Sequence, residues 1–455
     1  MSDLDLFFTP TTVAIIGASE HVGFGYATTK YLLESKFKTY PVSVTKSEIF
    51  GHKTYKNVKD IPDNIDLAIV MIKNEFVLQA VKDCAEKKIK NIIIESAGFA
   101  ETGIEKYKKM QDEIIKTAKT SDMRIIGPNC IGVNNFSNQF TTAEVDFNTI
   151  QKGGISIIAQ SGVLGNMFID WGGAQKMKFS KTITLGNKID VDEIDLIEYL
   201  ENDPETKVIT LYLEGVKRGK EFINILKKVK KPILILKNGR SEIGATATMS
   251  HTGSIAGNDR IFDAVIKQQK GIFRVNSFYE MLDIANVFST QPLPKGKNIA
   301  IITESGSLGI LACDLIEKNG LHLAKFNEET LQKMKQVAPD FVSVKNPVDI
   351  GPAMATTIMP SIKAVLNDSN VDCLLYIFAV PRWVLETINL SITPHFRLMS
   401  KLSKQLNKPC ICVIFGSRWV FEYVNKTASK YKIPAVIQIK HAIKAFKMMN
   451  EYSIK

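Results

Sequence analysis

The sequence predicts an α/β fold built from three parallel-sheet units in a row. Short apolar runs rich in Val, Ile and Leu alternate with longer amphipathic stretches along the whole chain. Nearly continuous apolar strands separated by helices are typical of parallel sheets that are covered on both faces. The expected strands are residues 12–16, 67–72, 91–95, 123–126, 155–159, 207–213, 232–237, 299–303, 373–379 and 410–414.

Two stretches divide the chain into these units. Residues 136–153 show no clear period, and residues 289–297 form a linker that carries proline and glycine. The length of 455 residues suits about three domains, each large enough for its own core. We therefore expect domains at residues 1–140, 150–290 and 296–455.

An internal repeat relates the second unit to the third. Residues 157–165 resemble residues 301–309, and in both copies an aspartate follows the shared serine by nine positions. A duplicated flavodoxin-like domain explains this similarity. The copies differ after one strand, where the second unit has Glu214 and the third has Ala379. We therefore assign the chemistry to the second unit.

Composition and charge exclude several classes of protein. Hydrophobic residues make up 45% of the chain, and no apolar run approaches the roughly 20 residues that span a bilayer. The N-terminus lacks the basic segment of a secretory signal, and the six dispersed cysteines have no metal-ligand spacing. The net charge of +11 comes mostly from lysines interspersed with acidic residues. We expect a cytoplasmic protein with no metal site and no membrane or nucleic-acid partner.

A glycine-bearing turn follows the first strand and predicts a Rossmann-like first domain. Residues 17–25 lead into a helix that begins at about Tyr26, so backbone N–H groups could bind a phosphate. The alternative is a tight turn with no ligand. Lys46 stands where an acidic residue would hold an NAD ribose, which disfavours NAD and suits another phosphate. The candidate ligand-binding residues of this domain are Gly17, Ser19, Gly23, Gly25, Lys46, Ser96, Ala97 and Gly98.

Residues 160–162 end another strand and begin a helix. The backbone N–H groups of Ser161 and Gly162 would form a pocket for a phosphate or phosphoryl group. Two different interpretations remain open. Ser161 could be a nucleophile, although the glycines of the G-x-S-x-G pattern are absent, or it could be a helix cap without function. Cys130 is expected to be a buried filler, because no basic neighbour favours its thiolate.

One histidine lies in a segment that has almost nothing to pack. Small, polar and glycine residues surround His251 from position 238 to 257, so we expect this loop to move. Glu214 ends a central apolar strand, where a carboxylate is costly unless it is paired or functional. A carboxylate that accepts one imidazole N–H leaves the other nitrogen able to attack phosphorus. Alone, His251 would be a structural or surface residue, whereas with Glu214 and the anion pocket it is favoured as a phosphoryl carrier.

Together these motifs resemble the α subunit of ADP-forming acyl-CoA (acetyl-CoA) synthetases, relatives of the succinyl-CoA synthetase α subunit in the NDP-forming acyl-CoA synthetase superfamily. The resemblance covers essentially the whole chain. Three segments depart from the family pattern: the first glycine-bearing loop is one residue shorter and lacks the usual proline, the segment before Lys46 lacks the usual Asn-Pro, and residues 303–307 (TESGS) replace an Asn-Ala-Gly-Gly run. The motifs that carry the resemblance are residues 127–130 (GPNC), 160–162 (QSG), 185–188 (LGNK), 190–192 (DVD), 211–215 (LYLEG), 237–240 (KNGR), 250–253 (SHTG) and 346–349 (NPVD).

The resemblance implies a role for each candidate residue. His251 would be phosphorylated, and Glu214 would stabilise the phosphohistidine. The candidate residues of the first domain would bind coenzyme A. The phosphate-binding residues would be Ser161, Gly162, Gln160 and Asn129.

The resemblance also implies a partner and a reaction. No segment after residue 290 resembles an ATP-grasp module, so we expect a separate β subunit that carries Mg²⁺ and ADP or ATP, in an α2β2 heterotetramer. Acyl-CoA, with acetyl-CoA as the expected substrate, would react with phosphate and ADP to give acid, CoA and ATP through an acyl phosphate. Three different functions remain possible at this point: a non-catalytic CoA-binding regulatory subunit, a succinate–CoA ligase-like enzyme and a Rossmann oxidoreductase.

Overall fold

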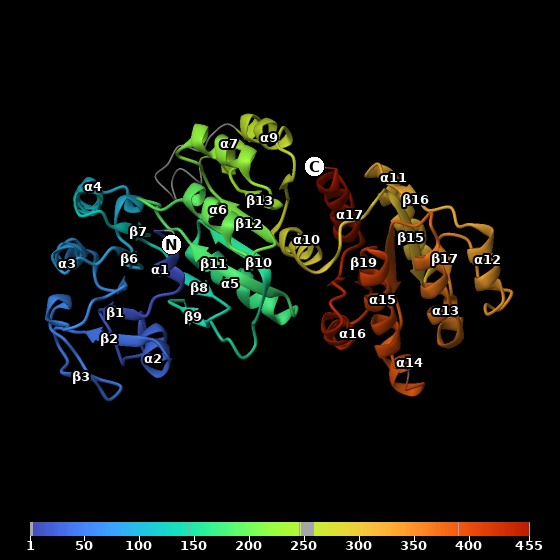
Figure 1. The fold of residues 1–455 in the computed structure, drawn as a ribbon, viewed down its shortest axis with the longest axis horizontal. Coiled ribbons are helices and arrows are strands. Elements are labelled where there is room, and N and C mark those ends of the chain that lie inside the picture. The colour runs from blue at the N-terminus through green and yellow to red at the C-terminus, as the bar shows by residue number, and fades with distance from the viewer. Residues whose placement is uncertain (1–2, 144, 245, 247–258, 390, 455) are drawn as a thin grey trace. The chain divides into compact units, whose positions relative to one another are not determined.

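The structure is a computed structural model that describes residues 3–143, 145–244, 246, 259–389 and 391–454. Strands and helices alternate through these residues, as Figure 1 shows, and the strands form three large sheets and one hairpin. The backbone divides into two compact units, Met1–Ala174 with Lys178–Val275, and Gln175–Met177 with Asn276–Lys455. The first unit contains two of the large sheets, and the second unit contains the third.

The first sheet is parallel, with the strand order β2-β1-β5-β6-β7. Alternate residues of β1 enter two different buried clusters, with Val13 and Ile15 in one and Ala14 and Ile16 in the other. Both faces are therefore covered, which is why the strand is a continuous apolar run in the sequence. The elements here are α1 (Asp5–Phe8), β1 (Thr12–Ile16), α2 (Tyr26–Glu34), β2 (Lys38–Val42), the hairpin β3 (Glu48–Ile49) and β4 (His52–Lys53), β5 (Leu67–Val70), α3 (Asn74–Glu86), β6 (Asn91–Ile94), α4 (Glu105–Thr120) and β7 (Arg124–Ile126).

The second sheet combines a parallel part, β14-β13-β12-β10-β11, with an antiparallel edge formed by β8 and β9. The sequence predicts only three strands of this sheet, residues 155–159, 207–213 and 232–237, so β8, β9, β11 and β14 are additions. In β11 the ammonium of Lys181 is buried 2.9 Å from the Asp203 carboxylate. Because this lysine interrupts the apolar run, a search for apolar strands does not detect β11. The elements are β8 (Val133–Asn135), β9 (Phe140–Thr141), β10 (Gln151–Ala159), α5 (Gly162–Ala174), β11 (Lys178–Thr184), α6 (Glu193–Asn202), β12 (Val208–Leu213), α7 (Gly219–Lys228), β13 (Ile233–Lys237), α9 (Asp259–Lys267) and β14 (Ile272–Arg274).

The third sheet repeats this parallel order. Its path β16-β15-β18-β19-β20 corresponds to β11-β10-β12-β13-β14, with β17 as an extra strand beside β15. This is the strand order of flavodoxin-like folds, so the predicted fold class is confirmed. The elements are α10 (Phe278–Thr290), β15 (Asn298–Thr303), α11 (Gly306–Lys318), β16 (His322–Leu323), α12 (Glu328–Lys335), β17 (Val348–Asp349), α13 (Met354–Asn367), β18 (Cys373–Phe378), α14 (Arg382–Thr387), α15 (Thr393–Leu406), β19 (Cys410–Ile414), α16 (Arg418–Lys430), β20 (Ala435–Val436) and α17 (Ile439–Ser453).

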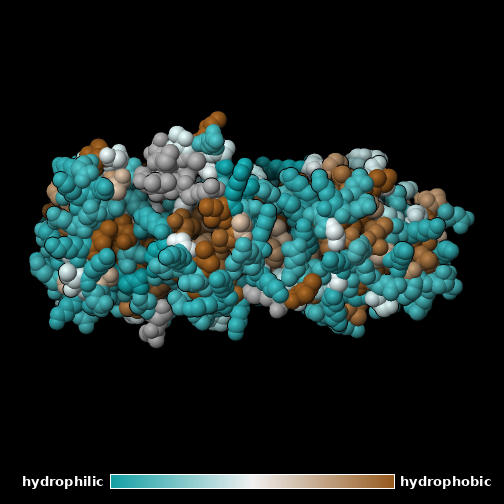
Figure 2. Space-filling view, turned by 90° about the horizontal axis from the view of Figure 1, so that it is seen from above, coloured by the Kyte–Doolittle hydropathy of each residue, from teal (hydrophilic) through white to brown (hydrophobic). Residues whose placement is uncertain are grey.

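The surface agrees with the solvated, lysine-rich exterior that the composition predicts. The face in Figure 2 is mostly hydrophilic, with separate apolar patches. None of the described helices combines the length and the apolar composition of a membrane span. All six cysteines are free; Cys313 is half-buried and the other five are buried.

Candidate active site

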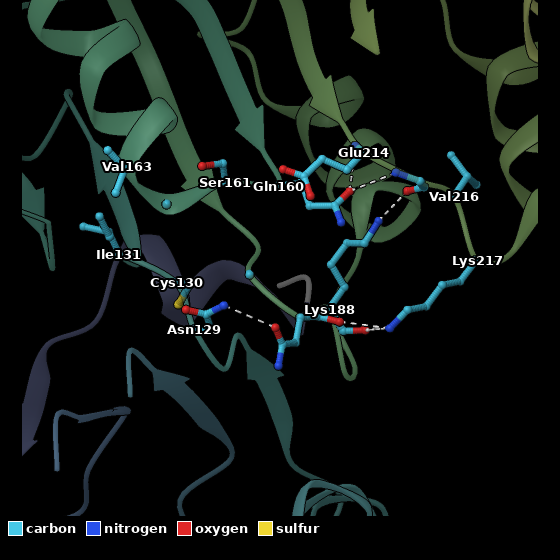
Figure 3. Close-up of a pocket in the computed structure, with 14 residues that line it drawn as sticks. Asn129, Cys130, Ile131, Gln160, Ser161, Val163, Lys188, Glu214, Val216 and Lys217 are labelled. Carbon is cyan, nitrogen blue, oxygen red and sulfur yellow. Dashed lines mark hydrogen bonds between the residues drawn. The ribbon is translucent and has the colours of Figure 1, made fainter. Parts of the chain in front are cut away.

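A cavity of about 530 Å³ opens at the carboxyl edge of the second sheet. Ligand sites in parallel α/β sheets form at this edge, because the loops that follow the strands converge there. Figure 3 shows its lining, which comes from residues 160–163 after β10, 186–188 after β11, 214–217 after β12 and 129–131 from the preceding loop. The structure therefore brings together all the predicted phosphate-binding residues and Glu214.

Gln160 braces the end of the neighbouring strand. Its Oε1 accepts the backbone N–H of Glu214 at 2.9 Å and that of Gly215 at 3.3 Å. Gln160 and Glu214 are 8% and 7% exposed, so these bonds lie in a largely desolvated site. Hydrogen bonds that satisfy buried amides are costly to remove, and they hold the turn after β12 in place.

Ser161 and Gly162 lie where α5 begins. A helix of 13 residues presents free backbone N–H groups and the positive end of its dipole at its N-terminus, which suits an anion. The Ser161 hydroxyl oxygen accepts the Leu164 N–H at 3.4 Å, a long capping bond. A Cβ atom at position 162 would lie 2.9 Å from Cγ1 of Ile131, so glycine permits the close packing of this turn against the loop opposite.

Two lysines to which the sequence assigned no role also line the cavity. Lys188 Nζ lies 2.9 Å from Oε2 of Glu193 and donates to the Gly215 carbonyl oxygen at 2.8 Å. Lys217 Nζ donates to the Asn187 carbonyl oxygen at 2.9 Å. Burial lowers the pKa of Lys217, and the positive charge of Lys188 lowers it further. In the sequence, Lys188 is signalled only by its place in the LGNK motif.

The carboxylate of Glu214 lies in a protected environment. The neighbouring Tyr212 has its pKa raised to about 12, first by burial and then by the charge of Glu214. Asn238 Nδ2 donates to the Tyr212 hydroxyl oxygen at 2.7 Å. Cys130 is buried as predicted, with Sγ 3.3 Å from the Ile94 carbonyl oxygen, and burial raises the pKa of its thiol, which opposes a nucleophilic role.

Comparison with known proteins decides the family. Residues 11–135, 152–288 and 299–437 match the families described as "CoA binding domain", "Succinyl-CoA ligase like flavodoxin domain" and "Ligase-CoA domain". The chain is 41% identical over 439 residues to acetate–CoA ligase (ADP-forming) II subunit alpha of Pyrococcus furiosus, with 95% of this chain and 94% of that protein covered. The chain belongs to the ADP-forming acetate–CoA ligase family.

Further relatives and solved structures are similar to this chain over nearly its whole length. Acetate–CoA ligase (ADP-forming) II of Archaeoglobus fulgidus is 36% identical, over 99% of this chain and 67% of that protein. A crystal structure from Pyrococcus horikoshii OT3 superposes with a TM-score of 0.87 at 36% identity and covers 99% of each chain. A dinucleotide forming acetyl-coenzyme A synthetase 1 of Ca. Korarchaeum cryptofilum, in complex with phosphate and ADP, gives 0.88 at 29% identity and covers 100% of this chain and 97% of that one.

Membership of the ADP-forming acetate–CoA ligase family confirms the predicted resemblance and the acid–thiol ligase class. It favours the enzyme over a non-catalytic regulatory subunit, a succinate–CoA ligase-like enzyme and a Rossmann oxidoreductase. The family and the CoA-binding match also support the use of CoA and a nucleotide, and the "subunit alpha" in the names of two Pyrococcus furiosus relatives supports a multi-subunit enzyme.

The predicted phosphoryl carrier of this family member, His251, lies outside the described residues, so its contact with Glu214 stays a prediction. The segment that leads to it starts beside Glu214, because β13 pairs with β12 through Lys237 and Leu213. The next residue, Asn238, is held at this edge by its bond to Tyr212.

The predicted CoA-binding residues lie at the carboxyl edge of the first sheet, after β1, β2 and β6. Gly17 has φ of +94°, and a Cβ atom there would lie 2.4 Å from the Met71 carbonyl oxygen, so this tight turn requires glycine. Lys46 Nζ lies 3.3 Å from Oε1 of Glu20. Ser96 is buried; its hydroxyl donates to the Ile72 carbonyl oxygen at 2.6 Å and its own carbonyl oxygen accepts the Asn129 N–H at 2.9 Å.

Proposed function

We propose that this chain is the α subunit of a two-subunit ADP-forming acyl-CoA synthetase, with acetyl-CoA as substrate. The observation that carries the proposal is the cavity at the edge of the second sheet, where the N-terminus of α5 and the carboxylate-bearing end of β12 line one space. The first is suited to bind phosphate and the second to orient an imidazole. The relative from Pyrococcus furiosus is named for acetate, which supports the choice of acyl group.

In the first step, the N–H groups of Ser161 and Gly162 hold inorganic phosphate at the start of α5, with Asn129 beside them in the cavity lining. A phosphate oxygen attacks the carbonyl carbon of the thioester. The C–S bond breaks, the thiolate of CoA leaves and takes up a proton, and an acyl phosphate remains. The contribution of the protein is to position the two substrates and to offset the phosphate charge.

In the second step, His251 takes the phosphoryl group. An imidazole nitrogen attacks phosphorus, the bond from phosphorus to the carboxylate oxygen breaks, and the free acid leaves. Glu214 accepts the N–H of the other imidazole nitrogen, which fixes the tautomer and stabilises the positive charge. The segment that carries the phosphorylated His251 then delivers the phosphoryl group to ADP on the partner subunit.

Coenzyme A is proposed to bind at the edge of the first sheet, on the turn of residues 17–25, with Lys46 and residues 96–98. The backbone of this turn is suited to a phosphate: Gly25, with φ of +83°, immediately precedes α2, whose N-terminus has no side-chain cap. The proposed domains are residues 1–140 for CoA, 150–290 for catalysis and 296–455 for a second ligase-type domain.

A β subunit with an ATP-grasp fold, which would hold Mg²⁺ and ADP, completes the proposed α2β2 enzyme. The chain spans 94% of the Pyrococcus furiosus α subunit but 67% and 48% of relatives from Archaeoglobus fulgidus and Methanocaldococcus jannaschii. The extra length of those relatives supports the idea that a further module works with this one.

The test is a search for the phosphoenzyme. The chain is mixed with its β partner, acetyl-CoA and phosphate, and analysed by mass spectrometry. We expect a phosphoryl group on His251 that is absent from the His251→Ala variant. Binding of CoA without phosphohistidine under any of these conditions would overturn the proposal in favour of a regulatory subunit.

A further inference from the structure

Two lysines join the loops on either side of the cavity. Lys188, in the turn after β11, donates to the Gly215 carbonyl oxygen at 2.8 Å, and Lys217, after β12, donates to the Asn187 carbonyl oxygen at 2.9 Å. Each loop thus receives an ammonium group from the other, as Figure 3 shows. Lys188 is held in turn by Glu193, the first residue of α6, at 2.9 Å.

Burying the Lys188–Glu193 ion pair costs desolvation free energy. The side chains are 2% and 1% exposed, and the desolvation of a buried ion pair offsets most of its attraction, so apolar residues of similar volume would stabilise the fold equally well. Lys188 also has φ of +52°, in the left-handed region where glycine or asparagine is favoured. A lysine kept at such a position points to a use for its side chain.

The bond from Lys188 is one of three that hold the turn formed by Glu214 and Gly215. Gln160 Oε1 accepts the N–H groups of Glu214 and Gly215, and Lys188 holds the carbonyl of Gly215. Gln160 thus fixes the peptide groups on both sides of the Glu214 Cα atom. Lys188 fixes the next peptide group, between Gly215 and Val216, so the turn after Glu214 keeps its conformation and with it the direction of the Glu214 Cα–Cβ bond. A misplacement of about 1 Å in a reacting group can slow a reaction by about 100-fold.

We propose that Lys188, held by Glu193, is a positioning residue that orients the Glu214 carboxylate in the cavity through the backbone of Gly215. This inference rests on the role proposed for Glu214 in phosphoryl transfer. A merely structural ion pair would affect folding stability alone. A positioning residue instead slows phosphoryl transfer at saturating substrate while the KM values for phosphate and acyl-CoA stay nearly unchanged.

The experiment uses the complex with the β subunit and measures the rate of His251 phosphorylation together with the thermal midpoint. Lys188→Met is expected to lower the rate at saturation by about 10- to 100-fold, with both KM values within about 2-fold of the parent. Lys181→Met is the matched control. Lys181 forms a buried pair with Asp203 at 2.9 Å in the same sheet, with side chains 6% and 7% exposed, but lies outside the cavity lining.

A double variant separates positioning from folding. Lys188→Met with Glu193→Met removes both charges, so it is expected to recover stability but not the rate. Recovery of the rate along with stability, or an equal loss of rate in Lys181→Met, overturns the positioning role. Absence of phosphohistidine in the unaltered complex overturns the proposed function on which the inference rests, so the two failures are distinguishable.

Discussion

Gln160 and Glu304 stand at matching positions in the second and third sheets and hold the same backbone group. Gln160 Oε1 accepts the N–H of Glu214 at 2.9 Å, and Glu304 Oε2 accepts the N–H of Ala379 at 2.9 Å. The acceptors Gln160 and Glu304 directly follow β10 and β15, and the donors Glu214 and Ala379 directly follow the paired strands β12 and β18. Both copies of the fold therefore contain this side-chain-to-backbone hydrogen bond. The residue whose N–H it holds is Glu214, with a carboxylate, in one copy and Ala379, with a methyl group, in the other.

Replacing Glu304 by Gln should stabilise the protein at alkaline pH. Burial raises the pKa of Glu304 to about 7, and the charge of Asp349 adds to this effect. Because the unfolded chain ionises at lower pH, the carboxyl group is best tolerated below about pH 4.5, and stability is lost as pH rises through about 7. An amide keeps the acceptor for Ala379 and avoids the buried charge. We expect a gain of about 1–2 kcal/mol in the free energy of unfolding at pH 8 and a clearly smaller gain near pH 5.

Denaturant unfolding at the two pH values measures this effect. Trp383 and Trp419 lie in the second compact unit and report on it by fluorescence. A gain of the same size at pH 5 and pH 8 would show that charge on Glu304 is not its source.

Replacing Gln160 by Leu should weaken both folding and catalysis. The change leaves two buried amides, those of Glu214 and Gly215, without their acceptor, which costs about 1–3 kcal/mol of stability. The loosened turn should also lower the rate of His251 phosphorylation by about 10-fold or more. Gln160→Glu is the control, since it keeps the acceptor that the third sheet uses. Unchanged thermal midpoint and rate in Gln160→Leu would argue against the brace.

Much of the fold could be predicted from the sequence because its strands are buried on both faces. Residues 12–16 and 410–414 are strands with the predicted bounds, and the rest of the predicted strands end within a few residues of their place. The strand β11 (KFSKTIT) was missed because two lysines interrupt its apolar pattern, and the partner of Lys181, Asp203, lies in another part of the chain. The strand β8 was missed because both its neighbours, β11 and β9, run antiparallel to it, and no local pattern reveals such partners.

The sequence predicts those residues of the candidate site that directly follow a recognisable apolar strand. Ser161 and Glu214 each follow an apolar strand, and the geometry of parallel sheets brings such positions together. The role of Lys188 could not be inferred in this way. Its acceptor, the carbonyl of Gly215, belongs to another loop, and a backbone oxygen leaves no trace in the amino-acid sequence.

Replacing Ser161 by Ala should leave the enzyme largely active. The proposed phosphate ligands at this position are backbone N–H groups, and the hydroxyl forms only a capping bond of 3.4 Å to Leu164. We expect at least a tenth of the parent kcat and a loss of about 1 kcal/mol of stability at most. Steady-state assays of the complex check this. A loss of all activity in a folded Ser161→Ala variant would support a nucleophilic role for the hydroxyl instead.

Replacing Glu214 by Gln should destabilise the phosphoenzyme without affecting CoA. The amide has the same shape, so the turn held by Gln160 should persist, but the negative charge that stabilises an imidazolium is lost. We expect the half-life of phosphorylated His251 to fall by about 10-fold or more, and the Kd for CoA, measured by calorimetry, to stay within about 2-fold because the CoA turn belongs to the first sheet. The pKa of Tyr212, which burial and the Glu214 charge raise to about 12, should fall in the same variant. Equal losses of phosphoenzyme stability and CoA affinity would contradict the role assigned to Glu214.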